Sequence, residues 1–340
     1  MKDFSQPWLS LIVPVRGGEP GLASCLTSLA ALAGPECEAL VVAQGDTALR
    51  ALDQAAPAGP AGWRLVSQPP QGPAAARACA LAQARGAVAL FLGPGCQVPP
   101  HLPGVIRRIM DETEAVGLSL LLKPDGQGEP LKRLAALELA WQAKELGLPQ
   151  MGCAAFRRAA AMGAGGLDPN LPEPQGDLLA LWLRLKAEGR ELYWDQDLFV
   201  RAALPGSWRG LLGQAWSEGR ESFQRLRLAR SLGPGLLPGQ GRERLQTLLA
   251  LLSPALLAGL WPLAPDRALT LTLLCLLLLY PLNRPFLRGV GESDPDLVNR
   301  ALLYCLLRPF AWLGGMLAAA GDRLGAGGGP SRAGSRPNMG

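Results

Sequence analysis

The sequence predicts an α/β domain with a doubly wound sheet, followed by a C-terminal hydrophobic helical region. Two observations carry this prediction. Between residues 9 and 92, four short apolar runs typical of buried strands alternate with stretches that have helical spacing, and such alternation favours parallel strand pairing. Further along, residues 245–265 and 268–283 contain no charged side chain, so each run has the composition of a membrane segment.

The four predicted strands are LSLIVPV, EALVVA, WRLVSQ and AVALFL, at residues 9–15, 38–43, 63–68 and 87–92. In doubly wound sheets, ligands bind beyond the carboxyl ends of the strands. We therefore expect a site near residues 16–19, 43–46 and 93–95. The pattern then predicts helices over residues 101–112, 133–146 and 176–188, a strand over 117–123, and an extended segment at 191–200.

Charge and composition narrow the partners of this chain. Its 340 residues have a formal net charge of +5, and residues 201–244 alone hold eight arginines against three glutamates. A basic stretch before hydrophobic segments favours a cytoplasmic membrane face near anionic lipid over nucleic-acid binding. His101 is the only histidine, and none of the seven cysteines forms a C-x-x-C pair. We therefore expect free thiols, no zinc site and, at the N-terminus, no signal peptide.

The hydrophobic region predicts a membrane-associated helical hairpin. Arginines precede it and Arg284 and Arg288 follow it, which places both ends on the cytoplasmic side; a hairpin buried in a soluble core is the alternative. The next apolar stretch contains Arg308 and Pro309 and predicts an interfacial amphipathic helix rather than a span. The chain is thus divided into a domain at 1–230, a basic linker and hairpin at 231–290, the amphipathic helix at 291–324, and a disordered low-complexity tail at 325–340.

Five segments in order carry a family likeness: LSLIVPVRGGEPGLASCLTSL, EALVVAQGDT, GPAAARACALAQARGAVALFLGPGCQVPP, MGCAAFRRAAAMGAGGLDPNL and GDLLALWLRLKAEGREL. Over roughly residues 8–230, the chain resembles the family 2 inverting glycosyltransferases. The resemblance implies a GT-A fold with a mixed sheet and a nucleotide-diphospho-sugar donor. In such enzymes a divalent cation on a D-x-D pair holds the diphosphate, and a carboxylate on the acceptor side acts as base.

This sequence departs from the family at its carboxylates. Gly93 and Gly95 stand at the two D-x-D positions, and Ala43 and Gln44 replace the acidic pair after the second strand. On the acceptor helix, Leu178 stands where the catalytic aspartate usually stands, and Asp177 where a glutamate does. Glycine and leucine can neither hold a cation nor take a proton. We therefore expect no metal ligands, and we expect a divalent cation to be dispensable.

Several residues remain as candidates. For nucleotide binding they are Pro14, Val15, Glu19, Gln44, Asp46, Arg77, Gly93 and Gly95, and for the acceptor side Arg157 and Arg158. Arg77 could pair with the diphosphate in place of a metal, or be an ordinary surface arginine. Asp177 could be the base, or cap its helix. Glu19, Arg157 and Arg158 could equally be solvated charges, and Asp46 a turn residue.

Two functions follow from these features. The first is a membrane-associated glycosyltransferase at the inner, cytoplasmic membrane, with its domain facing the cytoplasm and a lipid-linked or cell-envelope acceptor. The second is a catalytically inactive relative that serves as a scaffold or regulatory protein partner in an envelope glycan pathway. A lipid-binding protein without a nucleotide site is a third class, and nucleotide binding would argue against it.

Overall fold

The computed structural model describes residues 6–56, 63–125, 129–146, 152–169, 171, 176–232 and 240–326. Its centre is an eight-stranded sheet of order β3-β2-β1-β4-β7-β6-β8-β5. The strands are β1 (Leu9–Val15), β2 (Cys37–Gln44), β3 (Arg64–Gln68), β4 (Val88–Phe91), β5 (Cys96–Gln97), β6 (Gly117–Pro124), β7 (Cys153–Arg157) and β8 (Leu192–Ala202). Strands β1 to β4 are parallel, whereas β7 runs antiparallel to β4 and β6. The predicted mixed sheet is thereby confirmed.

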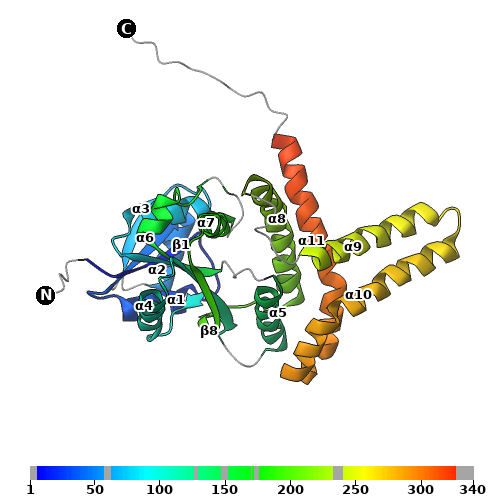
Figure 1. The fold of residues 1–340 in the computed structure, drawn as a ribbon, viewed down its shortest axis with the longest axis horizontal. Helices are drawn as coiled ribbons and strands as arrows, with labels where there is room; N and C mark the ends of the chain where they lie inside the picture. Colours follow the sequence, from blue (N-terminus) through cyan, green and yellow to red (C-terminus); the bar gives the residue numbers. More distant parts are fainter. Residues whose placement is uncertain are drawn as a thin grey trace, which may run out of the picture.

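Helices cover both faces of the sheet (Figure 1). They are α1 (Leu22–Leu32), α2 (Asp46–Ala55), α3 (Pro73–Gln83), α4 (Leu102–Thr113), α5 (Pro130–Leu146), α6 (Arg158–Gly163) and α7 (Gly176–Ala187). Alternate side chains of a strand point to opposite faces, so Leu11 and Val13 pack with α1, α4 and α5, whereas Ile12 packs with α3, α6 and α7. Two cores therefore hold the sheet between two helical layers, with the carboxyl ends of β1, β2 and β4 left at one edge.

Four long helices follow: α8 (Trp208–Leu232), α9 (Gln240–Leu260), α10 (Pro265–Ser293) and α11 (Val298–Ala326). Helices α9 and α10 form a hairpin whose tip points away from the sheet domain, and α11 runs along α8 (Figure 1). The base of the hairpin is anchored, because Phe286 and Val290 of α10 belong to the same core as the sheet. The predicted hairpin is therefore present, with one end fixed in the domain.

The hairpin presents apolar side chains to its surroundings. Leu263 at the tip is 84% exposed and Leu277 is 68% exposed, and Trp261 is exposed as well. By length and composition, two helices of the described part, Pro265–Ser293 and Pro295–Asp322, could cross a bilayer. An apolar surface of this kind is typical of membrane or protein interaction sites.

Helix α11 continues through Pro309 without a break and packs closely against α8. The contact is between backbones: a Cβ atom placed on Gly219 would lie 1.9 Å from the carbonyl oxygen of Trp312, and one placed on Gly315 would lie 1.9 Å from that of Trp216. Only glycine fits at such positions. The sequence predicted a helix in the membrane interface; that placement stays a prediction, and the structure adds a protein surface that α11 covers.

The contacts of Arg308 explain why α11 carries a charged residue in the middle of an apolar stretch. Its Nε lies 2.7 Å from Oε1 of Glu138 on α5, and its Nη2 lies 3.2 Å from Oε2 of Glu218 on α8. The Tyr304 hydroxyl donates to Glu138, and the Gln142 amide donates to both glutamates. We call these five residues the junction cluster. It joins α5, α8 and α11 through one buried carboxylate and the partly buried side chains around it.

Candidate functional site

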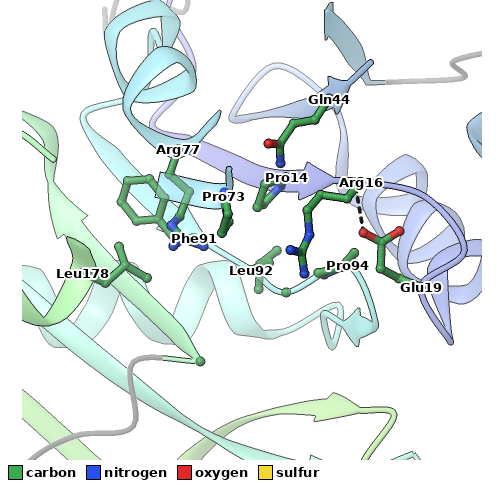
Figure 2. Close-up of a pocket in the computed structure, with 12 residues that line it drawn as sticks. Pro14, Arg16, Glu19, Gln44, Pro73, Arg77, Phe91, Leu92, Pro94 and Leu178 are labelled. Carbon is green, nitrogen blue, oxygen red and sulfur yellow. Dashed lines mark hydrogen bonds between the residues drawn. The ribbon is translucent and has the colours of Figure 1, made fainter. Parts of the chain in front are cut away.

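A pocket opens at the carboxyl ends of β1, β2 and β4, where the sequence predicted one (Figure 2). Its cavity volume is about 150 Å³, and its mouth is open to solvent. The lining residues are Pro14, Arg16, Glu19, Gln44, Pro73, Arg77, Phe91, Leu92, Gly93, Pro94, Gly152 and Leu178. Five of them belong to the predicted nucleotide-binding set; Val15, Asp46 and Gly95 do not line the pocket.

The loop after β1 is closed by Glu19. Its Oε1 accepts the backbone N–H of Arg16 at 2.7 Å (Figure 2). Its Oε2 accepts the backbone N–H of Gly17 at 2.8 Å. Both carboxylate oxygens are thus engaged by the loop's own backbone. In this geometry Glu19 shapes the loop, and the side chain that the loop offers to the pocket is that of Arg16.

Gln44, at the end of β2, is held in one orientation. Its Oε1 accepts the backbone N–H of Gly72 at 2.9 Å, and because an N–H can only donate, the amide oxygen is assigned to that side. Its Nε2 is therefore the other amide atom; it is buried and has no hydrogen-bond partner among the described residues, although the side chain is only 4% exposed. Leaving a buried donor unpaired costs about 1–3 kcal/mol. The exposed Asp46 lies in the first turn of α2, where its charge favours the helix dipole.

The loop after β4 has no room for an acid at its second position. A Cβ atom on Gly95 would lie 2.6 Å from the backbone oxygen of Pro20, a distance that real side chains do not adopt. At Gly93 the nearest atom to such a Cβ would be Cys96 Sγ at 3.4 Å, so a side chain there is tolerated. The first loop thus packs directly on Gly95, where the resemblance would place a metal-binding carboxylate.

Three buried cysteines lie close to the Gly93 loop without lining the pocket. The Sγ atom of Cys25 lies 4.0 Å from the Gly93 oxygen, and those of Cys96 and Cys153 lie 3.4 Å apart. Burial raises the pKa of Cys25 and of Cys153 well above the ordinary value, which keeps both thiols neutral. Within the described residues, no group of three His, Cys, Asp or Glu side chains could hold a metal ion. The residues present do not fit the divalent cation that the family implies.

Arg77 and Asp177, for which the sequence predicted separate roles, meet in the structure. Arg77 on α3 donates from Nε to Oδ2 of Asp177 at 2.8 Å and from Nη2 to Oδ1 at 2.6 Å. The side chains are 7% and 0% exposed. Both carboxylate oxygens of Asp177 are therefore bound to a guanidinium and out of reach of an acceptor hydroxyl. This geometry supports a structural ion pair between α3 and α7; the role of base stays a prediction that requires the pair to open.

The two predicted acceptor-side arginines lie outside the pocket lining. Arg157 donates from Nε to the carbonyl oxygen of Ala115 at 3.0 Å and from Nη2 to that of Met110 at 2.6 Å. It thereby ties β7 to the end of α4. The Nε atom of Arg158 is buried without a hydrogen-bond partner in the described part of the chain. The placement gives Arg157 a structural role, and contact of either residue with an acceptor stays a prediction.

Among the lining residues that sequence reasoning missed, Arg16 is the charged one. Figure 2 shows its side chain pointing into the pocket, with the guanidinium near Leu92 and Pro94. No side-chain hydrogen bond or ion pair joins it to another described residue. The signal that could have found it was its position: it is the first residue after β1, at one of the strand ends where a ligand was expected.

Comparison with known proteins agrees with this geometry. The sequence model of glycosyl transferase family 2 matches residues 10–162. This region is therefore similar to family 2. It includes the strand ends that line the pocket, so the departures described above lie within the matched region.

Solved structures extend the likeness to the fold of nearly the whole chain. The mannosyltransferase PcManGT from Pyrobaculum calidifontis, in complex with GDP-Man and Mn²⁺, matches with a TM-score of 0.59 and 18% identity, over 95% of this chain and 88% of that one. TarS 1–349 from S. aureus in complex with UDP-GlcNAc matches with a TM-score of 0.44 and 14% identity, over 93% and 92%. No curated protein matches the sequence. The first of these likenesses confirms the predicted GT-A fold.

Proposed function

We propose that this protein is a membrane-associated family 2 glycosyltransferase that binds a nucleotide-sugar at the strand-end pocket and transfers the sugar to a lipid-linked or cell-envelope acceptor. Its domain faces the cytoplasm at the inner membrane. The observation that carries the proposal is the pocket at the carboxyl ends of β1, β2 and β4, in a region similar to family 2 whose chain continues into an exposed apolar hairpin. Donor and lipid would then meet at the same molecule.

A nucleoside diphosphate sugar is the donor class that the site supports. PcManGT, the neighbour with the same fold, is described with GDP-Man. In this chain, Arg16 and Gln44 offer hydrogen-bond donors at two strand ends, and α3 begins at the pocket with Pro73. Donor groups and a helix N-terminus suit a ligand with phosphate and carbonyl oxygens.

The hairpin supports a membrane-bound acceptor. Its exposed leucines lie on both arms and at the tip, including Leu248, Leu263 and Leu274. Burial of such side chains in lipid is favourable by about 1.5–3 kcal/mol each when complete. The arginines of residues 201–244 and the pair Arg284 and Arg288 flank the apolar arms in the sequence, which favours the cytoplasm for both ends.

One observation favours the inactive alternative. Among the described lining residues, Glu19 is the sole carboxylate, and its oxygens are held by the loop backbone; Asp177 is held by Arg77. A general base must be within hydrogen-bond reach of the proton it removes. A scaffold or regulatory partner that binds nucleotide-sugar without turnover is therefore the second candidate function.

The test combines transfer and location. The full chain, purified in a mild detergent, is incubated with a panel of labelled uridine, guanosine and thymidine diphosphate sugars and a lipid extract from its host membranes. Transfer of label into the lipid phase supports the enzyme; binding without transfer supports the scaffold. In parallel, the chain is expected in the alkali-washed membrane fraction, and replacement of Leu274 and Leu277 by Glu is expected to release it. Absence of both binding and membrane recovery would overturn the proposal.

A further inference from the structure

We propose that the pocket binds a nucleoside diphosphate without a divalent cation, through two hydrogen-bond donors that no family motif assigns here: the Arg16 guanidinium and the Gln44 Nε2 amide. The inference deepens the proposed function and rests on it. It states which atoms of this chain take the place of the missing metal, and it excludes Arg77, whose charge is matched by Asp177.

The Nε2 amide of Gln44 is a hydrogen-bond donor without an acceptor among the described residues. Its oxygen is committed to the Gly72 N–H at 2.9 Å, and its Nε2 is buried and unpaired among the described residues. Figure 2 shows this nitrogen turned toward Pro14 and Arg16, on the pocket side of β2. Because a buried donor without a partner is unfavourable, a ligand oxygen at this point is stabilising twice over: it forms a bond and removes an unsatisfied group. We assign this contact to the nucleoside.

The guanidinium of Arg16 is the cation that can reach a phosphate. It lies on the exposed end of β1, points into the pocket over Leu92 and Pro94 (Figure 2), and has no ion-pair partner among the described residues. The nearby N-terminus of α3 has no side-chain cap, and it adds partial positive charge. A guanidinium binds phosphate oxygens with two parallel hydrogen bonds. We assign this contact to the diphosphate.

The carboxylates near the pocket are already hydrogen-bonded to protein groups, so they are not available as metal ligands. Glu19 accepts two backbone N–H groups, and Asp177 accepts two bonds from Arg77. Backbone of the first loop occupies the space that a side chain on Gly95 would need. The side chains of the pocket thus offer donors to a ligand, which is the arrangement expected for an anion bound directly by protein groups.

The experiment is calorimetric titration of the full chain in detergent with UDP, GDP, CDP and dTDP, in EDTA and then with Mg²⁺ or Mn²⁺. We expect one of the four to bind with the same Kd in EDTA as with metal. Arg16→Ala is expected to weaken that binding at least about tenfold, because one charge-assisted phosphate contact is lost, and Arg16→Lys to restore part of it. Arg50→Ala is the matched control: Arg50 is exposed on α2 and does not line the pocket.

Gln44→Glu tests the donor alone. The substitution keeps an oxygen for the Gly72 N–H but turns Nε2 into an acceptor, so we expect a loss of about tenfold or more. Gln68→Glu is its control, since Gln68 lies opposite Gln44 in the β2–β3 register, also has a buried unpaired Nε2, and does not line the pocket. Binding that requires metal, or unchanged binding by Arg16→Ala, would overturn this inference and leave the proposed function intact. No binding by the unmodified chain would overturn both. Because Arg16 is exposed, its variants decide the matter even if Gln44→Glu fails to fold.

Discussion

Two clusters of charge, one buried and one partly buried, lie in different parts of this molecule and differ in their ratio of acidic to basic groups. At the pocket, the Arg77 guanidinium is paired with the single carboxylate of Asp177 among the described residues. In the junction cluster, Arg308 faces two carboxylates, those of Glu138 and Glu218. A matched pair needs no further charge, whereas two acids against one guanidinium leave an excess that a proton can neutralise. The ratio of carboxylates to guanidinium groups, and not burial alone, therefore determines whether a cluster keeps its charge state or titrates with pH.

The two clusters also act on different parts of the function. The pair at the pocket joins α3 to α7 and removes two charged residues from the set available to a ligand. The junction cluster joins α11 to α5 and α8, and it fixes the base of the helical region on the sheet domain. The first cluster thus pairs two charged side chains at the pocket, and the second attaches the C-terminal helices to the sheet domain.

The largest effect is expected at the matched pair. Asp177→Ala leaves the Arg77 guanidinium buried without its carboxylate, and we expect a loss of about 3–5 kcal/mol in the free energy of unfolding. Denaturant unfolding of the full chain in detergent measures it. The double variant Arg77→Met with Asp177→Leu should recover most of that loss, because no uncompensated charge remains. If Asp177→Ala is as stable as the unmodified chain, the ion pair does not stabilise the packing of α3 against α7.

The next largest effect is the pH dependence of stability that the junction cluster causes and the Arg77–Asp177 pair does not. Burial raises the pKa of Glu138 from its ordinary 4.5 to about 7, Arg308 opposes this, and Glu218 adds to it. The folded state thus binds a proton more tightly than the unfolded chain, so this stabilisation is complete below about pH 4.5 and is lost as the pH rises through about 7. The change is on the order of 3 kcal/mol.

Thermal unfolding between pH 5 and pH 8 measures this effect, on the order of 3 kcal/mol, against Glu138→Gln, which cannot titrate. We expect the stability of the unmodified chain relative to this variant to fall as the pH rises. A difference that is constant with pH would mean that Arg308 keeps Glu138 ionised throughout, and the contrast between the two clusters would then disappear.

A smaller effect is expected where the first loop covers the former acid position. Gly95→Asp forces a side chain against the Pro20 carbonyl and should lower stability by about 1–3 kcal/mol, as overpacking does. Gly93→Asp, with 3.4 Å to the nearest atom, should be milder. Neither variant, nor the two together, should gain Mn²⁺ binding by calorimetry. Tight Mn²⁺ binding by the double variant would show that only the two acids are missing from a metal site.

The smallest effect is expected at Asp46, which lies next to the pocket without lining it. Asp46→Ala removes a charge from the first turn of α2 and should lower stability by about 0.3–1 kcal/mol. Nucleoside diphosphate binding should be unchanged, in contrast to Gln44→Glu two residues earlier. A loss of binding comparable to that of Gln44→Glu would extend the ligand site beyond the residues that line the pocket.

Sequence patterns were enough for the elements and for the place of the site. The β-branched and leucine-rich runs agree with β1 to β4 within about a residue at each end, because alternation and turn residues are local properties. The uncharged runs at 245–265 and 268–283 overlap α9 (Gln240–Leu260) and α10 (Pro265–Ser293), but the helix bounds differ from the bounds of the runs. The order of strands and helices then located the pocket, since parallel strands bring their carboxyl ends to one edge.

The partners of the charged residues were decided only by the tertiary structure. Arg77 and Asp177 are 100 positions apart, and no local pattern shows that each neutralises the other. Pro20 and Gly95 likewise meet only because β1 and β4 are neighbours in the sheet. In the sequence, Arg308 only interrupts an apolar helix; the structure shows that its carboxylate partners lie on α5 and α8. Composition and periodicity determined which segments form helices and strands and where the pocket lies. Which hydrogen-bond donors remain free for a ligand depends on long-range pairing, because a buried charge pairs with an opposite charge that is close in space and can be distant in sequence.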